Sequence, residues 1–195
     1  MKVLLATEKP FAAEAVTGIK KVLDEAGFEL VILEKYTDKK QLLDAVASTD
    51  AAILRSDIFD KEVLDAGKNL KIVVRAGAGF DNIDLAAATA NNICAMNTPG
   101  QNANAVAELV FGLMVYGVRN FYNGKSGTEL QGKKLGIHAY GNVGQNVGRI
   151  AKGFGMKVYA FDPFLNAEAI EKAGAIPVAS VEELYATCQY VSLHI

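Results

Sequence analysis

Short apolar runs alternate with amphipathic segments along the first hundred residues. The apolar runs predict buried strands, and they lie at residues 3–6, 30–33, 51–54, 72–75 and 93–96. Apolar positions at helical spacing between them predict helices, which we expect at residues 10–26, 38–46, 61–66 and 84–90. This alternation is typical of a parallel sheet with helices on both faces. We therefore expect an α/β fold with a flavodoxin-like domain over residues 1–98.

The segment Asn97-Thr98-Pro99-Gly100 breaks the alternation and predicts a domain boundary. A second domain is then expected over residues 99–195, beginning with a long helix over 102–120. The apolar face of this helix is expected to hold Glu108 in a buried hydrogen bond and to consist of Val106, Leu109, Val110, Leu113 and Met114. Residues 121–131 are polar and contain glycine, which predicts a loop or arm.

Residues 132–164 have the order of a dinucleotide-binding βαβ unit. Residues 134–139 predict a strand, 157–161 predict a second strand, and a glycine-bearing turn and a helix lie between them. Such a turn lets the backbone approach a pyrophosphate, and the helix N-terminus supplies unpaired N–H groups. Asp162 lies 18 residues after Gly144, where an acidic side chain accepts the ribose hydroxyls. The residues of the turn at the predicted site are Gly141, Asn142, Val143 and Gly144.

One position departs from the G-x-G-x-x-G pattern, because Ala139 stands where the first glycine is usual. Alanine carries a steric cost at positive φ, so we expect an altered turn that keeps the site. The alternative is a parallel α/β unit whose glycine turn binds nothing. Pro163, and not an arginine, follows Asp162, so the carboxylate would repel a 2′-phosphate and NAD is favoured over NADP.

The last thirty residues predict two more helix–strand pairs and end on a strand at residues 190–195. A doubly wound sheet normally has two mononucleotide halves. We therefore expect a partial Rossmann domain that holds only the first half, in a shortened chain.

Composition narrows the class of protein. The chain has 195 residues, a net charge of −2 and 51% apolar residues, which suits packed cores and argues against nucleic-acid or anionic-membrane partners. Cys94 and Cys188 are expected to be small core residues and not a disulfide or metal site. Because the chain has only two histidines, we do not expect a histidine-rich metal site. The longest apolar run, residues 109–118, is too short to span a bilayer, and a cytoplasmic protein is expected.

Several stretches together resemble the NAD-dependent D-isomer-specific 2-hydroxyacid dehydrogenases. These stretches are LRSD (54–57), VVRAGAGFDNID (73–84), NTPGQNANAVAELVFGLM (97–114), the βαβ unit (130–163) and SVEELYATCQYVSLHI (180–195). They follow the family's order and span nearly the whole chain. The resemblance implies that the first domain binds substrate, that the second binds NAD, and that the protein is a homodimer.

The resemblance also implies roles for individual residues. Backbone N–H groups of Ala76, Gly77, Ala78 and Gly79 would bind the substrate carboxylate. Arg55, Ser56 and Arg75 would meet a phosphate or carboxylate, which a guanidinium fork suits. Asn102 would contact substrate or cofactor, and His194 and Ile195 would line the cofactor pocket. The alternative to this substrate-binding role is that Arg55 and Arg75 form ordinary ion pairs at the surface.

In the family, an arginine and a histidine–glutamate pair perform the chemistry, and all three lie downstream of residues 190–195. No catalytic residue is therefore expected in this chain, and the chain alone is expected to be inactive. The reaction that the resemblance implies for the complete protein is oxidation of 3-phosphoglycerate to 3-phosphohydroxypyruvate. The alternatives are another 2-hydroxy acid, such as glycerate or lactate, and a non-enzymatic, corepressor-like protein that binds a dinucleotide.

Overall fold

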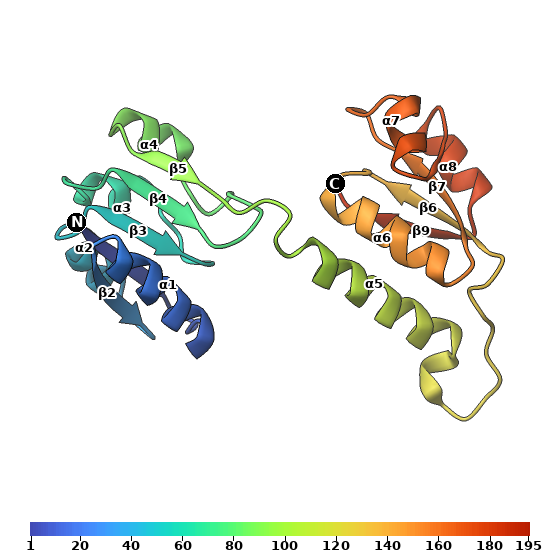
Figure 1. The fold of residues 1–195 in the computed structure, drawn as a ribbon, viewed down its shortest axis with the longest axis horizontal. Coiled ribbons are helices and arrows are strands. Elements are labelled where there is room, and N and C mark those ends of the chain that lie inside the picture. Colours follow the sequence, from blue (N-terminus) through green and yellow to red (C-terminus); the bar gives the residue numbers. More distant parts are fainter. The chain divides into compact units, whose positions relative to one another are not determined.

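The computed structural model describes residues 1–195 as two compact units, Met1–Pro99 (unit 1) and Gly100–Ile195 (unit 2) (Figure 1). Each unit has its own sheet and its own core, and each is described by itself. No helix in either unit combines the length and apolarity that crossing a bilayer requires.

Unit 1 has a five-stranded parallel sheet in the order β2-β1-β3-β4-β5. Its strands are β1 (Lys2–Thr7), β2 (Glu29–Glu34), β3 (Ala51–Leu54), β4 (Ile72–Arg75) and β5 (Cys94–Met96). Its helices are α1 (Ala13–Glu25), α2 (Lys39–Val46), α3 (Lys61–Ala66) and α4 (Leu85–Ala90). This strand order is that of the flavodoxin-like fold, which confirms the predicted class.

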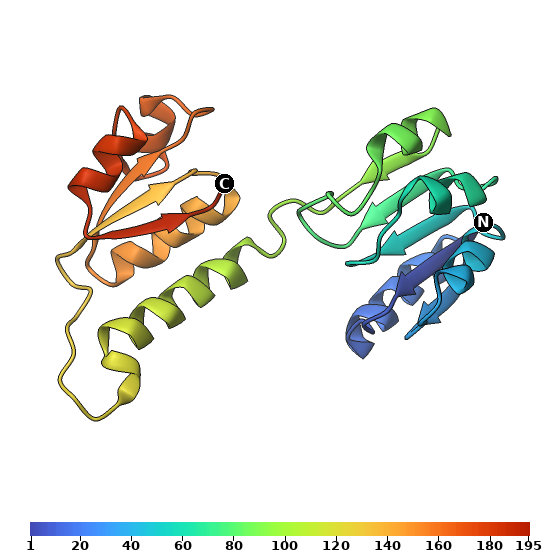
Figure 2. The ribbon, with the colours of Figure 1, turned by 180° about the vertical axis from the view of Figure 1, so that it is seen from behind.

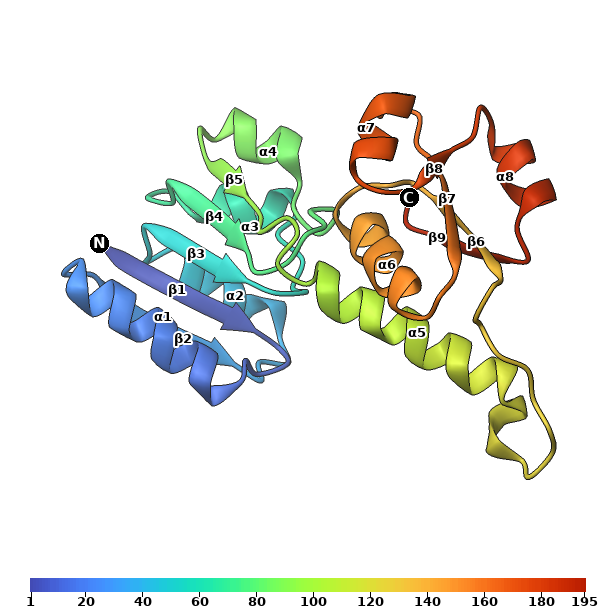
Figure 3. The same cartoon turned by 45° about the vertical axis from the view of Figure 1, so that its right-hand side comes forward.

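The core of unit 1 lies between one face of the sheet and helices α2, α3 and α4 (Figure 3). Leu4 and Ala6 of β1 face this core, as do Leu54 of β3 and Val73 of β4. Side chains on these strands alternate between the two faces of the sheet. Helix α1 has no buried residue and packs on β2.

Acidic side chains begin three of the helices in unit 1. Asp38 accepts from Lys40 N, Asp60 accepts from Val63 N, and Asp84 accepts from Ala87 N. These bonds satisfy N–H groups that the first turn of a helix leaves free. Caps predicted at Asp38 and Asp84 are thereby confirmed.

Unit 2 begins with α5 (Ala103–Val118) and the 3₁₀ turn η1 (Asn120–Tyr122), followed by a four-stranded parallel sheet in the order β8-β7-β6-β9 (Figure 2). Its strands are β6 (Lys134–His138), β7 (Lys157–Phe161), β8 (Ile176–Pro177) and β9 (Tyr190–Leu193). Its other helices are α6 (Asn142–Gly153), α7 (Ala167–Lys172) and α8 (Val181–Thr187). Numbered within the unit, the strand order is 3-2-1-4, which is one mononucleotide half and the next strand of a Rossmann sheet.

Two helix layers cover one face of this second sheet. Helix α6 packs on β6 and β7, and α5 packs on α6. Leu135 and Ile137 of β6 contribute to that core, while Gly136 points to the opposite face, where a Cβ would lie 2.9 Å from Leu184 of α8. A side chain at Gly136 would therefore push α8 away from the sheet.

Helix α5 buries only part of the face that we predicted. Val110 and Met114 pack against the core beside the buried Ala103, Ala107 and Phe111, whereas Leu109 and Leu113 are exposed. Glu108 is also exposed and accepts a hydrogen bond from Asn104 Nδ2 at 2.6 Å, so its predicted burial was wrong. The small alanines let α5 approach α6 closely, and Phe111 stacks on Phe154 with 5.0 Å between the ring centroids.

The prediction for the cysteines was wrong for Cys94, which is exposed, while Cys188 is partly buried. Cys94 begins β5, the strand at the edge of the sheet, where one side has no neighbouring strand. An apolar run of edge-strand residues therefore does not imply full burial.

Candidate functional site

In unit 2, three strands end side by side at the predicted dinucleotide site. His138 at the end of β6 pairs with Phe161 of β7 and with Leu193 of β9. The backbone N–H of His194 continues this pairing and donates to His138 O at 2.9 Å. The direction of strand order reverses between β6 and β9, which is where open α/β sheets bind ligands.

The turn after β6 has the strained conformation that its sequence suggests. Ala139 has a φ of +72°, a region that alanine enters at a steric cost. Its N–H donates to Phe161 O at 2.9 Å, which anchors the turn to β7. The absence of the first glycine is therefore accommodated by strain at one residue, and the turn keeps its place.

Gly141 and Gly144, the two glycines of the turn, have different structural roles. A Cβ on Gly144 would overlap the carbonyl oxygen of Ala139 and lie 3.1 Å from Ile137, so this glycine lets α6 start directly against β6. A Cβ on Gly141 would meet no atom within 4 Å, and the φ of Gly141 is an ordinary −76°. Neither packing nor backbone conformation requires glycine at position 141. A ligand that approaches the backbone closely would require glycine there.

Helix α6 begins at Asn142 without a side-chain cap. Gly141 is the N-cap residue and offers no side-chain acceptor to the first turn. The N–H groups of Asn142, Val143 and Gly144 therefore lie at the positive end of the helix dipole without a protein acceptor, which suits an anion.

Asp162, directly after β7, is fixed beside this turn. Its Oδ2 accepts from Tyr140 N at 2.7 Å, and its Oδ1 accepts from Phe164 N at 2.8 Å. Each carboxylate oxygen keeps a lone pair for a further donor. The structure thus brings Asp162 together with residues 141–144, and these residues fit the pyrophosphate and ribose of a dinucleotide.

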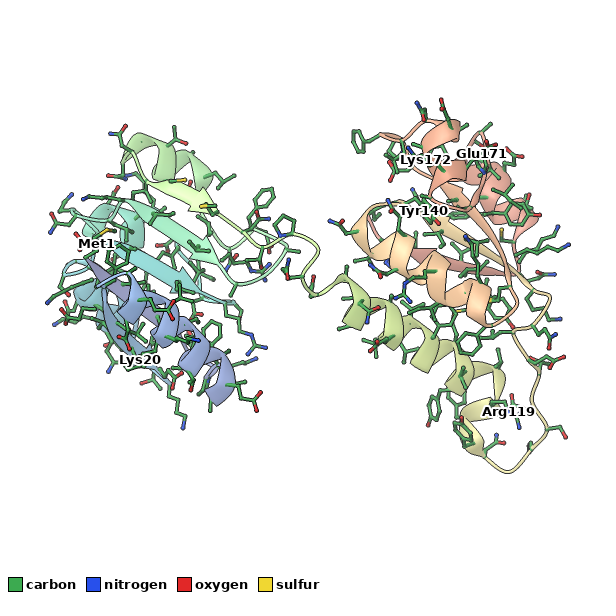
Figure 4. All side chains as sticks on the ribbon, viewed as in Figure 1. Met1, Lys20, Arg119, Tyr140, Glu171 and Lys172 are labelled. Atoms are coloured by element: carbon green, nitrogen blue, oxygen red, sulfur yellow. The ribbon has the colours of Figure 1, made fainter.

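Tyr140 was not predicted to matter, yet it is fully buried within the turn (Figure 4). Its hydroxyl donates to Ala173 O at 3.3 Å, and its ring covers Gly148, where a Cβ would lie 2.6 Å from the hydroxyl. Burial raises the pKa of Tyr140 above its usual value. The one sequence signal for this packing is Gly148, a second glycine in α6 four residues after Gly144.

His194 and Ile195 lie beyond the end of β9. His194 Nε2 is 2.9 Å from Ser192 Oγ, and burial lowers the pKa of this imidazole. Ile195 is exposed. His138, whose ring points to the α8 side of the sheet, instead pairs its Nδ1 with the Tyr185 hydroxyl at 2.9 Å.

In unit 1, the predicted substrate residues come together at the ends of β3 and β4. Arg55 and Ser56 follow β3 and are exposed. Arg75 ends β4, and its Nε donates to Arg55 O at 3.0 Å while its Nη1 donates to Gly79 O at 2.8 Å. Arg75 thereby holds the loop of residues 76–79, a role that the sequence did not indicate, and two of its five donors are used in doing so.

The glycines of the loop are explained by that arginine. A Cβ on Gly77 would lie 2.8 Å from the Arg75 guanidinium carbon, and a Cβ on Gly79 would lie 2.9 Å from its Nη1. Asn97 Nδ2 also donates to Ala78 O at 2.6 Å. The loop is therefore folded tightly over Arg75.

Not every N–H group of the loop is free to bind an anion. Ala76 N donates to Leu54 O and Gly77 N donates to Arg75 O, whereas the N–H groups of Ala78 and Gly79 have no protein acceptor. The predicted anion site narrows from four residues to these two. Asn102, the remaining predicted residue, is the exposed N-cap of α5 in unit 2, and its side chain makes no capping bond.

Unit 1 is flavodoxin-like and unit 2 has a dinucleotide-type turn, a combination that is typical of two-domain dehydrogenases. The sequence matches the family described as D-isomer specific 2-hydroxyacid dehydrogenase, catalytic domain, over residues 5–191. The chain belongs to this family.

Several proteins that are similar in sequence or structure are named as dehydrogenases or reductases of hydroxy acids. The chain is 34% identical to a D-3-phosphoglycerate dehydrogenase of Methanocaldococcus jannaschii, over 90% of this chain and 36% of that protein. It is 35% identical to a hydroxypyruvate reductase of Thermotoga maritima, over 86% of this chain and 58% of the relative. The crystal structure of NAD⁺-bound 3-phosphoglycerate dehydrogenase of Entamoeba histolytica superposes with a TM-score of 0.90 and 46% identity, over all of this chain and 62% of that one. The chain thus spans less than two thirds of the length of each relative.

Proposed function

We propose that the whole protein is an NAD-dependent 3-phosphoglycerate dehydrogenase. In this proposal, residues 1–98 bind the substrate and residues 99–195 bind NAD. The observation that carries the proposal is the open space at Gly141 beside the anchored carboxylate of Asp162, in a chain 46% identical to an enzyme named for this activity.

The cofactor would be held by residues of unit 2 that have free polar groups. The pyrophosphate would accept from the N–H groups of Asn142 and Val143, with Gly141 leaving room for it. Asp162 would accept from the ribose hydroxyls, and its charge disfavours a 2′-phosphate. His194 and Ile195 would line the same pocket. Bound NAD⁺ takes up the hydride.

The substrate would be held by unit 1. The N–H groups of Ala78 and Gly79 would bind its carboxylate, because they lack protein acceptors. The exposed guanidinium of Arg55, with Ser56, would bind the phosphate. Arg75 positions the loop and has three N–H groups left for the ligand. Asn102 is the proposed contact from unit 2.

Oxidation of a hydroxyl group also needs a base within hydrogen-bond reach. We assign the role of this base to none of the substrate- and cofactor-binding residues named here. We therefore expect the 195-residue chain alone to bind NAD⁺ without turning over substrate.

The test is a comparison of substrates with the full-length protein. We expect kcat/KM for 3-phosphoglycerate to exceed that for glycerate and lactate by at least about a hundredfold, since charge-assisted bonds to a phosphate are worth a few kcal/mol. Arg55→Gln should raise KM for 3-phosphoglycerate and leave KM for glycerate nearly unchanged. An equal effect on both acids would exclude Arg55 as the phosphate ligand.

A second candidate is a dehydrogenase for an unphosphorylated 2-hydroxy acid. The Thermotoga maritima relative named hydroxypyruvate reductase favours it, at 35% identity against 34% for the phosphoglycerate enzyme of Methanocaldococcus jannaschii. A preference for glycerate in the same assay would establish this reading. Binding of NAD⁺ with no turnover of any acid by the full-length protein would favour the corepressor-like alternative.

We also propose that the protein is a homodimer through α5 and η1. Large apolar side chains on these elements are exposed, namely Leu109, Leu113, Tyr116, Phe121 and Tyr122. Phe121 and Tyr122 have φ values of 55° and 54°, which costs energy in bulky residues and is commonly offset by contacts elsewhere. A second copy of the chain would cover this surface.

A further inference from the structure

The loop after η1 contains an asparagine–glycine pair that the proposed function does not use. Asn123 is followed by Gly124, and no other asparagine of the chain is followed by glycine. Residues 119–129 are all exposed, so solvent water reaches this pair. An asparagine amide can react with the backbone nitrogen of the next residue, and a side chain on that residue hinders the approach. Because glycine has no side chain, this pair has the sequence that favours the reaction.

The backbone nitrogen of Gly124 is free to act as the nucleophile. Its N–H donates to no carbonyl group of the protein. Gly124 has a φ of +82°, a conformation that other residues adopt at a cost, and a Cβ on it would meet no atom within 4 Å. The nitrogen is therefore neither hydrogen-bonded nor covered by neighbouring side chains.

The side-chain amide of Asn123 is held against the same stretch of backbone. Its Oδ1 accepts from Lys125 N at 3.0 Å, so the side chain bends along the chain and spans the peptide group of Gly124. This hydrogen bond also draws electrons from the amide carbon Cγ, which makes the carbon a better target for a nucleophile. The Nδ2 of Asn123 donates to no protein acceptor, and it is therefore free to leave as ammonia.

The other asparagines of the chain lack this combination. Each of them is followed by a residue with a side chain. Asn120, in the same loop, donates from its Nδ2 to Ser126 O and precedes Phe121. Further asparagines whose Nδ2 donates to a protein acceptor are Asn82, Asn91, Asn97, Asn104 and Asn146. The free amide and the unhindered nitrogen therefore coincide at Asn123.

We propose that Asn123 is a site of spontaneous modification, at which the side-chain amide becomes a carboxylate. The Gly124 nitrogen loses its proton to a base in solution and attacks Cγ of Asn123. The new N–Cγ bond closes a succinimide ring, the Cγ–Nδ2 bond breaks, and Nδ2 takes up a proton and leaves as ammonia. Water then adds to one of the two carbonyl carbons of the ring and opens it to aspartate or isoaspartate. The sequence consumes one water and releases one ammonia, and nothing is oxidised or reduced.

The modification changes both the charge and the backbone of the loop beside η1. It adds one negative charge to a chain whose net charge is −2, close to the cation of Lys125. Isoaspartate also puts an extra carbon into the main chain, directly after residues 120–122, whose φ values are all positive. Because bulky residues hold such φ values at a cost, the longer main chain lets this turn relax.

Peptide mapping of the aged protein tests the proposal. The 195-residue chain is incubated in mildly alkaline buffer and cut by trypsin after Arg119 and Lys125, which gives one peptide that contains both Asn120 and Asn123. Mass spectrometry with fragmentation follows each amide of this peptide separately. We expect Asn123 to convert at least about tenfold faster than Asn120, and to give isoaspartate as well as aspartate. The rate should rise with pH, because the Gly124 N–H must lose its proton.

Two matched variants assign the reacting nitrogen. Gly124→Ala keeps the asparagine but places a Cβ beside the nitrogen, and it should slow the conversion of Asn123 by about tenfold. Gly132→Ala is the control, because Gly132 also has a positive φ, +73°, and open space around its Cβ position, and it should leave the rate unchanged. Isoaspartate identifies the succinimide, since direct hydrolysis of the amide gives aspartate alone. Equal rates at Asn120 and Asn123, aspartate without isoaspartate, or equal rates in the two glycine variants would overturn the proposal.

Discussion

The backbone N–H of Tyr140 donates to Oδ2 of Asp162 across 2.7 Å, and this bond joins the turn after β6 to the end of β7. Phe164 N holds the other carboxylate oxygen at 2.8 Å. The side chain that would recognise a ribose is thus fixed before any ligand binds, which lowers the entropic cost of binding.

Asp162→Asn tests the charge of this side chain. The amide keeps one acceptor for the backbone and has nearly the same shape, but it no longer repels a 2′-phosphate. We expect the affinity ratio of NAD⁺ to NADP⁺, measured by calorimetry, to fall by about tenfold or more. An unchanged ratio would mean that Asp162 does not contact the ribose.

Ala139→Gly should stabilise the protein, because glycine adopts a φ of +72° without the steric cost that alanine has there. We expect the free energy of unfolding in urea to rise by up to about 1 kcal/mol, after the greater entropy of glycine in the unfolded chain is subtracted. The control is Ala26→Gly, where φ is −85° and the same replacement should destabilise. A loss of stability in both variants would contradict the assignment of strain to Ala139.

Gly144→Ala should destabilise unit 2 by about 2 kcal/mol, because the new Cβ overlaps the carbonyl oxygen of Ala139. Gly141→Ala should cost no more than about 1 kcal/mol, since its Cβ enters open space and alanine is only a poorer N-cap than glycine. Urea unfolding of both variants measures the difference. Equal losses would show that the two glycines have the same structural role.

His194 should titrate below its ordinary range, because burial lowers its pKa. Near pH 6.5 the imidazole of His194 therefore binds a proton in the unfolded chain but not in the folded chain. Stability from this residue is therefore full above about pH 6.5 and is lost as the pH falls through the folded pKa. The chain has two histidines, so His138→Gln isolates the His194 signal in a proton NMR titration; a value at or above 6.5 would be against burial as the cause.

Leu113→Lys should break the proposed dimer, because a charge would enter an apolar interface. Light scattering at tens of micromolar should give the mass of a dimer for the original chain and of a monomer for the variant. Val22→Lys, on exposed α1 of unit 1, is the control and should stay dimeric. A monomeric original chain would rule out this interface.

Local pattern predicted the elements well. The strand of residues 157–161 was predicted with its true bounds, and the caps at Asp38 and Asp84 follow from side chains two or three residues from the N–H groups they bind. Such features depend on neighbours in the sequence. The flavodoxin-like sheet follows from strand–helix alternation in the same way.

Contacts between distant residues were not predictable. Helix α5 is apolar on most of its surface, so its sequence could not show that Ala107 is buried and Leu109 exposed. The bond of Arg75 to Arg55 O, and that of Tyr36 to Asp57, join residues about twenty positions apart and use acceptors that sequence patterns do not reveal. Such contacts fix the loop of residues 76–79 through Gly79 O and hold Oδ1 of Asp57.

We propose that Gly141 is glycine because a dinucleotide lies against it. Calorimetric titration of NAD⁺ into the 195-residue chain and into Gly141→Ala tests this proposal. We expect saturable binding of one NAD⁺ per chain, and at least about a hundredfold weaker binding by a variant that remains folded. Equal affinity in the two proteins would contradict it.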